Sequence, residues 1–171
     1  LVNSMASVML STTISLLLAR DFSELPGGEM ISDSKKITKD FSQLNKYEVT
    51  EKGSKVAVIG LGTFYNMGCE VAKEVEEKTG TKATVINPYY ITGIDEILLE
   101  DLKKDHDVVI TLEDGFLEGG FGEKIARFYG DSDVKVLNYG VKKELLDRYD
   151  VTELLEKNHL TVQQIVGDLK F

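Results

Sequence analysis

The chain has 171 residues, of which 42% are hydrophobic and 29% are charged, and its formal net charge is −9. This length accommodates one ordinary domain with an additional segment, and the apolar content is sufficient for a packed core. The acidic balance argues against binding to nucleic acid or to an anionic membrane, because both require a basic surface. Cys69 is the only cysteine, which excludes an intramolecular disulfide and a cysteine-rich zinc site and fits a cytoplasmic protein.

The N-terminal segment is unusual, because residues 1–19 carry no charge and include the stretch VMLSTTISLLLA. Serine and threonine residues interrupt its apolar side chains, whereas a membrane span needs about 20 mostly apolar residues. No basic region precedes the stretch, as it would in a secretion signal. Since the sequence begins with Leu1 instead of methionine, we expect residues 1–25 to be the tail of a preceding domain, buried or packed at an interface.

Residues 26–46 are polar and lack any apolar period. They open with Pro26, Gly27 and Gly28, which are typical of turns, and we interpret this segment as a linker. From residue 47 onward, short apolar runs alternate with amphipathic stretches. The predicted strands are residues 56–61, 84–86, 108–112 and 134–137.

Helices are predicted between and after these strands, from apolar residues that recur three or four positions apart. The first of these helices is predicted to end at Gly80, since glycine commonly caps a helix C-terminus. Two capping-box spacings predict where other helices begin, Thr92 with Asp95 and Thr161 with Gln164.

The stretch VVITLEDGFLEGGFGEKIARFYG, residues 108–130, is the most informative part of the chain. Its apolar start predicts a buried parallel strand, which Glu113, Asp114 and Gly115 are expected to end. Glycines then permit tight turns ahead of a helix with one apolar face. The glycines are Gly119, Gly120 and Gly122, and the apolar residues are Phe121, Ile125 and Phe128.

Strands that alternate with helices predict an α/β fold for residues 47–171. Right-handed crossovers between parallel strands place helices on both faces of a sheet. We therefore expect three layers, α/β/α, built around a mainly parallel sheet.

Four segments in this order resemble the C-terminal domain of the thiamine-diphosphate-dependent transketolase family, and most closely its 1-deoxy-D-xylulose-5-phosphate synthase branch. They are KVAVIGLGT (55–63), VINPYYITGIDEILL (85–99), DHDVVITLEDG (105–115) with the GGFG turn after it, and VLNYG (136–140). The likeness covers residues 47–170 and implies the same three-layer fold.

The resemblance implies a noncatalytic domain that completes a subunit of a transferase and contributes to dimer packing. In the family, two other domains hold thiamine diphosphate and Mg²⁺, so no cofactor, metal or catalytic residue is expected in this chain. The implied partners are the preceding domains of the parent enzyme and a second subunit. The family's phosphate-binding arginine is not carried over to Arg20, because Asp21–Leu25 separate it from Pro26.

Three other hypotheses stay open from the sequence. Residues after Gly140 depart from the synthase pattern, so the parent could be transketolase or the β subunit of a 2-oxoacid dehydrogenase. The chain could also be a free-standing interaction module that docks through its uncharged N-terminal segment. A nucleotide-binding protein that uses the turn at residues 60–68 is the third.

Glu113, Asp114, Gly119, Gly120 and Gly122 form the candidate anion-binding or interface site. Backbone N–H groups at a helix N-terminus attract anions, but two other glutamates in the segment add negative charge, and close packing at a turn explains the glycines equally well. Glu113 and Asp114 could act as a paired acid and base. Because neighbours in a strand point to opposite faces, capping or an interface contact is the favoured interpretation.

Two glycine motifs match known sites only in part. Gly60, Gly62 and Gly68 lie between a strand and a helix, but they lack the G-x-G-x-x-G spacing of a dinucleotide site, so we interpret them as a tight structural turn. The segment 130–132, Gly-Asp-Ser, precedes Asn158 roughly as a magnesium motif would, but with serine in place of the second glycine.

The remaining candidates are three single residues. His106 and His159 have no second ligand at metal spacing, and both are interpreted as turn residues. Cys69 is interpreted as a small packing residue, not as a nucleophile.

Overall fold

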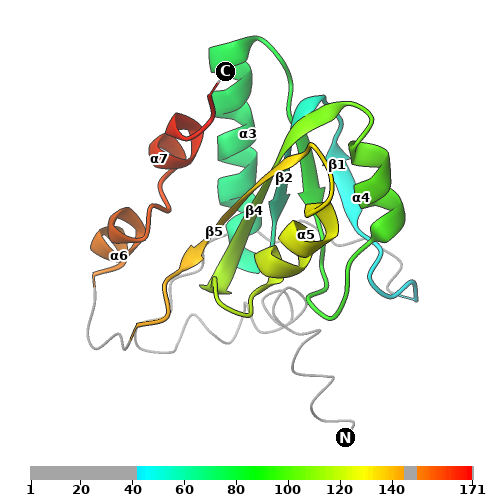
Figure 1. Ribbon diagram of the computed structural model, residues 1–171. Coiled ribbons are helices and arrows are strands. Elements are labelled where there is room, and N and C mark those ends of the chain that lie inside the picture. The colour runs from blue at the N-terminus through cyan, green and yellow to red at the C-terminus, as the bar shows by residue number, and fades with distance from the viewer. Residues whose placement is uncertain (1–41, 145–149, 171) are drawn as a thin grey trace, which may run out of the picture.

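The computed structural model describes residues 42–144 and 150–170 (Figure 1). The strands are β1 (Glu48–Glu51), β2 (Lys55–Gly60), β3 (Thr84–Asn87), β4 (His106–Phe116) and β5 (Lys135–Val141). The helices are η2 (Gly62–Phe64, a 3₁₀ turn), α3 (Tyr65–Thr79), α4 (Glu96–Leu102), α5 (Phe121–Tyr129), α6 (Val151–Lys157) and α7 (Val162–Gly167). The predicted tail, residues 1–25, and all but the last few residues of the predicted linker lie outside the described ranges, so this division of the chain stays a prediction.

The strands form one sheet in the order β1-β3-β2-β4-β5. β3, β2, β4 and β5 are parallel, and β1 pairs antiparallel with β3, with Glu48 opposite Asn87. The prediction of a mainly parallel sheet is confirmed. The four parallel strands end at one edge, the carboxyl edge, which is the lower edge in Figure 1, where the arrowheads of β4 and β5 lie. The opposite edge is called the amino edge.

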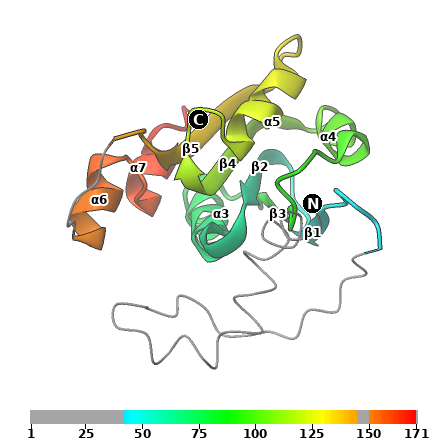
Figure 2. The same cartoon turned by 90° about the horizontal axis from the view of Figure 1, so that it is seen from below.

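Helices cover both faces of this sheet, α3 and α7 on one and α4 and α5 on the other (Figures 1 and 2). The core under α3 and α7 includes Val58, Val71, Val75, Ile110 and Ile165. The core under α4 and α5 includes Ile59, Leu99, Val109, Ile125 and Tyr129. Adjacent residues of β2 and of β4 enter opposite cores, because successive side chains in a strand point to opposite faces. The predicted three-layer α/β/α fold is confirmed.

Two elements of the structure, β1 and α6, are not among the predicted strands and helices. β1 has the sequence EVTE, with a single apolar residue, and it is a strand because β3 supplies its hydrogen-bonding partner at the sheet edge. α6 buries none of its residues, and it begins where the Asp150 side chain accepts hydrogen bonds from Thr152 N and Glu153 N. None of the helices in residues 42–144 and 150–170 has the length and apolar character needed to cross a membrane.

Two of the predicted helix ends are confirmed. Gly80 caps α3 in the left-handed conformation, with φ of 70°, which glycine adopts without strain. At α7, the Thr161 side chain accepts from Gln164 N, and the Gln164 side chain accepts from Thr161 N, so the capping box is complete.

The capping box predicted for Thr92 is wrong. Asp95 is the N-cap of α4, and its side chain accepts hydrogen bonds from Leu98 N and from Tyr47 N. The Thr92 hydroxyl instead donates to Asn45 Oδ1 at 2.8 Å. The spacing misled because Asp95 is itself a strong N-cap, which moves the helix start three residues later.

The prediction that Glu113, Asp114 and Gly115 end the third predicted strand is also wrong. β4 continues to Phe116, which pairs with Val141 of β5 after an irregularity that follows Leu112. Two extra residues of β4 are accommodated there, because pairing passes from Leu112 opposite Tyr139 to Phe116 opposite Val141. Such bulges bend a strand and redirect its side chains.

Candidate functional site

The carboxyl edge is where open α/β sheets usually place their sites, at the point where the strand order reverses. That point lies between β2 and β4, because the chain leads from β2 to β3 on one side and from β4 to β5 on the other. Glu113 and Asp114 lie in the last part of β4 at this point, and the glycine turn follows them. The structure therefore brings the predicted candidate residues together.

Glu113 caps the N-terminus of α5 from the preceding strand. The residue is 4% exposed, and both of its carboxylate oxygens accept backbone hydrogen bonds. Phe121 N donates to Oε2 at 2.7 Å and Gly122 N donates to Oε1 at 2.8 Å. These are the first two residues of α5, whose N–H groups have no partner within the helix. The carboxylate also lies at the positive end of the helix dipole.

Glycines are needed around Glu113 because the chain packs so closely there. A Cβ on Gly120 would lie 2.5 Å from Glu113 Oε2, and a Cβ on Gly122 would lie 2.6 Å from Thr111 Oγ1. Gly119 has φ of 74°, in the left-handed region that favours glycine. Close packing and turn geometry thus account for all three glycines.

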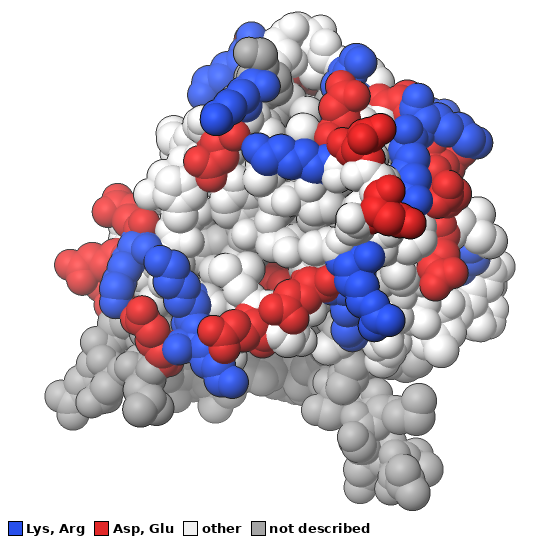
Figure 3. Space-filling view, in the orientation of Figure 1, with Lys and Arg blue, Asp and Glu red and all other residues white. Residues whose placement is uncertain are grey.

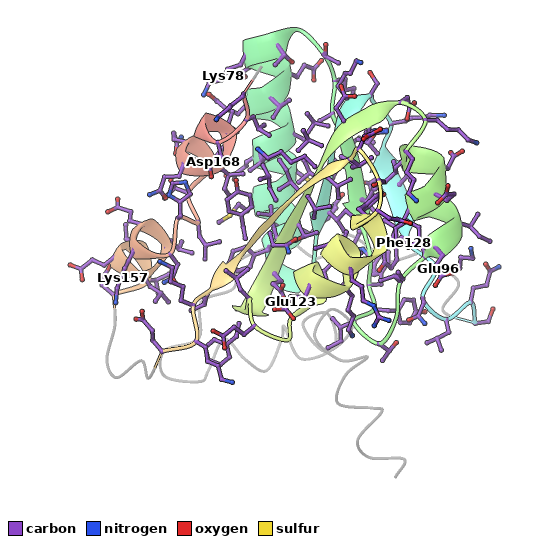
Figure 4. The ribbon with its side chains drawn as sticks, in the orientation of Figure 1. Lys78, Glu96, Glu123, Phe128, Lys157 and Asp168 are labelled. Carbon is purple, nitrogen blue, oxygen red and sulfur yellow. The ribbon has the colours of Figure 1, made fainter. Side chains whose placement is uncertain are left out.

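An external anion at this turn would have to compete with Glu113. The N–H groups of Phe121 and Gly122 donate to its carboxylate, and Gly120 N donates to Leu117 O at 3.1 Å. Glu123, labelled in Figure 4, adds a further exposed carboxylate in the first turn of α5. The chain's own carboxylate therefore occupies the donors that a ligand would use.

The two adjacent carboxylates face different surroundings. Burial raises the pKa of the Glu113 carboxyl, and the hydrogen bonds from Gly122 and Phe121 offset part of this effect. Asp114 is exposed, and its Oδ2 accepts a hydrogen bond from Thr63 Oγ1 at 3.2 Å. A paired acid and base would need both groups at one substrate, and this arrangement does not provide that.

The turn between β2 and α3 is tight for structural reasons. A Cβ on Gly60 would lie 2.6 Å from Tyr65 Cα, and a Cβ on Gly68 would lie 3.4 Å from Val58 Cγ1. Gly62 has φ of 62°. Gly60 thus lets the start of α3 approach β2, whereas a Cβ on Gly68 would be at ordinary contact distance. No side chain caps the N-terminus of α3.

The interpretation of His106 as an ordinary turn residue is wrong. His106 is the first residue of β4 and is 5% exposed. Its Nε2 lies 2.8 Å from Thr84 Oγ1, and its Nδ1 lies 3.2 Å from Leu102 O and 2.6 Å from Asp105 Oδ1. The Thr84 hydroxyl also accepts from Gly53 N at 3.0 Å, so the ring joins three segments at the amino edge.

His159 lies on the other side of the sheet, near the end of the chain. Its Nε2 is 3.0 Å from Asp168 Oδ2, and the same oxygen accepts a hydrogen bond from Tyr139 OH at 2.8 Å. Cys69 is partly exposed on α3, next to the Tyr65 hydroxyl. Across residues 42–144 and 150–170, no group of three or more His, Cys, Asp or Glu side chains could hold a metal ion.

The residues of the partial magnesium motif are not brought together. Gly130 caps the end of α5, ahead of β5. Asn158 lies beyond α6, and its Oδ1 accepts a hydrogen bond from Lys142 N, just past the other end of β5. The length of β5 separates the two places, about 20 Å at the rise of a strand.

The sequence analysis did not identify the polar side chains that form hydrogen bonds with residues distant in sequence. Thr111 Oγ1 donates to Asn138 Oδ1 at 2.8 Å, beside Gly122, and Tyr139 OH reaches Asp168. On the face shown in Figure 3, Lys and Arg side chains are mixed with Asp and Glu, which gives no extended basic surface there.

The chain belongs to the family described as Transketolase, C-terminal domain, whose model matches residues 45–165. Among curated relatives, the 1-deoxy-D-xylulose-5-phosphate synthase of Alkaliphilus oremlandii (strain OhILAs) is 32% identical over 130 residues, covering 74% of this chain and 21% of the synthase. The enzyme of the same name from Francisella tularensis subsp. novicida (strain U112) is 29% identical over 131 residues, covering 74% and 20%. The chain thus spans about a fifth of the length of these relatives.

A solved structure supports the same assignment. A split-gene transketolase, described as an inactive β4 tetramer, superposes with a TM-score of 0.65 and is 26% identical. The match covers 73% of this chain and 41% of that chain.

Proposed function

We propose that this chain is the noncatalytic C-terminal domain of a thiamine-diphosphate-dependent transferase, a 1-deoxy-D-xylulose-5-phosphate synthase. The observation that carries the proposal is the family match over residues 45–165, together with relatives of that name at 29% and 32% identity. The parent enzyme would join pyruvate and glyceraldehyde 3-phosphate, releasing carbon dioxide and forming 1-deoxyxylulose 5-phosphate. In this cytoplasmic enzyme, the domain would pack against the preceding domains and a second subunit.

The geometry of the carboxyl edge supports a structural role. The strongest candidate acid, Glu113, has both oxygens engaged by the backbone of α5. Its neighbour Asp114 bonds to Thr63. The described residues therefore do not fit thiamine diphosphate and its Mg²⁺, and no catalytic step is assigned to them. In this proposal those groups bind to other domains of the parent enzyme.

A calorimetric titration tests the proposal directly. The chain of 171 residues is titrated with thiamine diphosphate and Mg²⁺, and the polypeptide encoded by the continuous reading frame upstream of Leu1 is titrated in parallel. We expect the longer polypeptide to bind the cofactor and to release carbon dioxide from pyruvate only when glyceraldehyde 3-phosphate is present. We expect the 171-residue chain to do neither. Tight cofactor binding or pyruvate turnover by that chain alone would refute a noncatalytic role.

A second parent within the family is favoured by the structural match to the split-gene transketolase. A parent of that kind would transfer a two-carbon unit from a ketose phosphate and would release no carbon dioxide. The assay of the longer polypeptide with each donor separates the two. A start codon directly before Leu1 would instead favour a free-standing interaction module.

A further inference from the structure

Large hydrophobic side chains that remain exposed gather at the carboxyl edge. In the described residues they are Leu44, Val49, Ile91, Ile97, Phe116 and Val151. Phe116 ends β4, and Ile97 and Val151 lie in the first turns of α4 and α6, which follow β3 and β5. Leu44 and Val49 flank the start of β1, and that start pairs with the carboxyl end of β3. Ile91 lies in the connection after β3.

The amino edge has a different surface. Its turns carry charged residues, and exposed ion pairs join Lys82 to Glu51 and Lys55 to Asp107. None of the large exposed hydrophobic residues in the described part of the chain lies at this edge. Because apolar side chains that cluster at one end of a domain mark a contact surface, the asymmetry indicates that the carboxyl edge is covered in the native protein.

The first described residues contact the domain at this same edge. Asn45 Oδ1 accepts a hydrogen bond from Thr92 at 2.8 Å, and Lys46 Nζ lies 3.0 Å from Asp95 Oδ1. Both contacts are made to the connection between β3 and α4, which leaves the sheet at its carboxyl edge.

The sequence upstream of these residues is suited to cover apolar residues. Residues 1–19 contain no charged side chain, and leucine is their commonest residue. Residues 20–41 separate this segment from the domain, and when extended they span up to about 70 Å, so reach does not limit contact. Attachment to the same chain also gives the segment a high effective concentration at the surface.

We propose that the carboxyl edge, centred on Phe116 and Ile97, is the docking surface for residues 1–19 of the same chain. Phe116 is 46% exposed and Ile97 is 75% exposed. Burial of both side chains against an uncharged segment would remove apolar surface from water, which is favourable. This inference does not depend on which reaction the parent enzyme catalyses.

Site-specific photocrosslinking of the whole chain tests this inference. The photoreactive amino acid p-benzoylphenylalanine replaces Phe116 in one variant and Ile97 in a second, and both positions are exposed enough to accept it. The matched control carries it at Lys82, an exposed position in the turn between α3 and β3, at the amino edge. Trypsin releases residues 1–20 as one peptide, since Arg20 is the first basic residue.

We expect positions 116 and 97 to crosslink to the peptide 1–20, at least tenfold more than position 82. A mixture of ¹⁴N- and ¹⁵N-labelled chains identifies the source, and we expect both halves of the crosslinked product to carry the same label. Three outcomes would overturn the proposal: no crosslink to peptide 1–20, products of mixed label, which indicate a second copy, or equal yields at position 82. Cofactor binding by the chain would refute the proposed function and leave this inference standing.

Discussion

The two ends of β4 each contain one buried polar side chain, and the two are held in different ways. At the carboxyl end, Glu113 directs a single carboxylate at two backbone N–H groups of one helix. At the amino end, His106 uses its two ring nitrogens to join Thr84 of β3 to Leu102 and Asp105, which lie at the end of α4 and in the turn before β4.

The two ends of β4 differ in which other residues their buried side chains require. Glu113 works only because glycines let the chain approach it, with hypothetical Cβ atoms on Gly120 and Gly122 far inside contact distance of their neighbours. The His106 network also contains a close-packed glycine, since a Cβ on Gly53 would lie 2.0 Å from Lys82 O. It needs in addition a threonine on β3, which β2 separates from β4. Both side chains form hydrogen bonds with buried polar atoms, and leaving such an atom without a partner costs free energy. We therefore expect substitutions at Glu113 and His106 to lower the stability of the domain, whether or not a ligand binds.

Replacement of Glu113 by alanine is expected to give the largest effect. It leaves Phe121 N and Gly122 N buried without an acceptor, at about 1–3 kcal/mol each. We expect Glu113→Ala to lower the free energy of unfolding by about 4 kcal/mol, measured by urea denaturation. The control is Asp114→Ala at the exposed neighbour, expected to cost about 0.5 kcal/mol or less. Equal losses at the two positions would show that the cap contributes little.

A methyl group on Gly122 tests the packing of the helix start that Glu113 caps against Thr111 and Asn138. Alanine normally stabilises a helix relative to glycine, but here its Cβ would lie 2.6 Å from Thr111 Oγ1. We expect Gly122→Ala to destabilise the domain by about 2 kcal/mol. Gly167→Ala in α7 is the matched control, because a Cβ there meets nothing within 4 Å, and it should be neutral or stabilising by about 0.5 kcal/mol. A neutral Gly122→Ala would mean that the turn has room to relax.

At the amino end, His106→Leu keeps the volume and removes both hydrogen-bonding nitrogens. Thr84 Oγ1 and Leu102 O lose a partner in a buried place, so we expect a loss of about 2 kcal/mol in the free energy of unfolding. Asp107→Ala, at an exposed position paired with Lys55, serves as the control and should change stability by less than about 0.5 kcal/mol. A His106→Leu variant as stable as this control would show that the hydrogen bonds of His106 contribute little to stability.

The fold could be predicted because hydrophobic pattern and burial agree along the central strands. Val58 and Ile59, or Val109 and Ile110, fill opposite cores, as expected of strands covered on both faces. β1 could not be predicted, since a polar edge strand owes its conformation to a partner that is distant in sequence.

The candidate site could be located from the sequence but not explained by it. The cluster at residues 113–122 was found from its glycines and acidic pair. The contact of Glu113 with Phe121 N and Gly122 N was not, because a side chain that binds backbone atoms eight and nine residues away leaves no residue-type pattern. His106 was misjudged because two aspartates flank it, while its burial depends on Thr84, 22 positions earlier.

The pH dependence of Glu113 is expected to give the smallest effect, because its two hydrogen bonds oppose the effect of burial. Burial raises the pKa of the carboxyl above its ordinary 4.5, so folding favours the protonated form. The contribution of this group to stability is then fully present below pH 4.5 and is lost as the pH rises through the raised value. Against the non-titrating variant Glu113→Gln, the wild-type chain should therefore lose relative stability across that interval. A carboxyl titration by NMR gives the pKa itself, and a value at or below 4.5 would mean that the helix N–H groups outweigh burial.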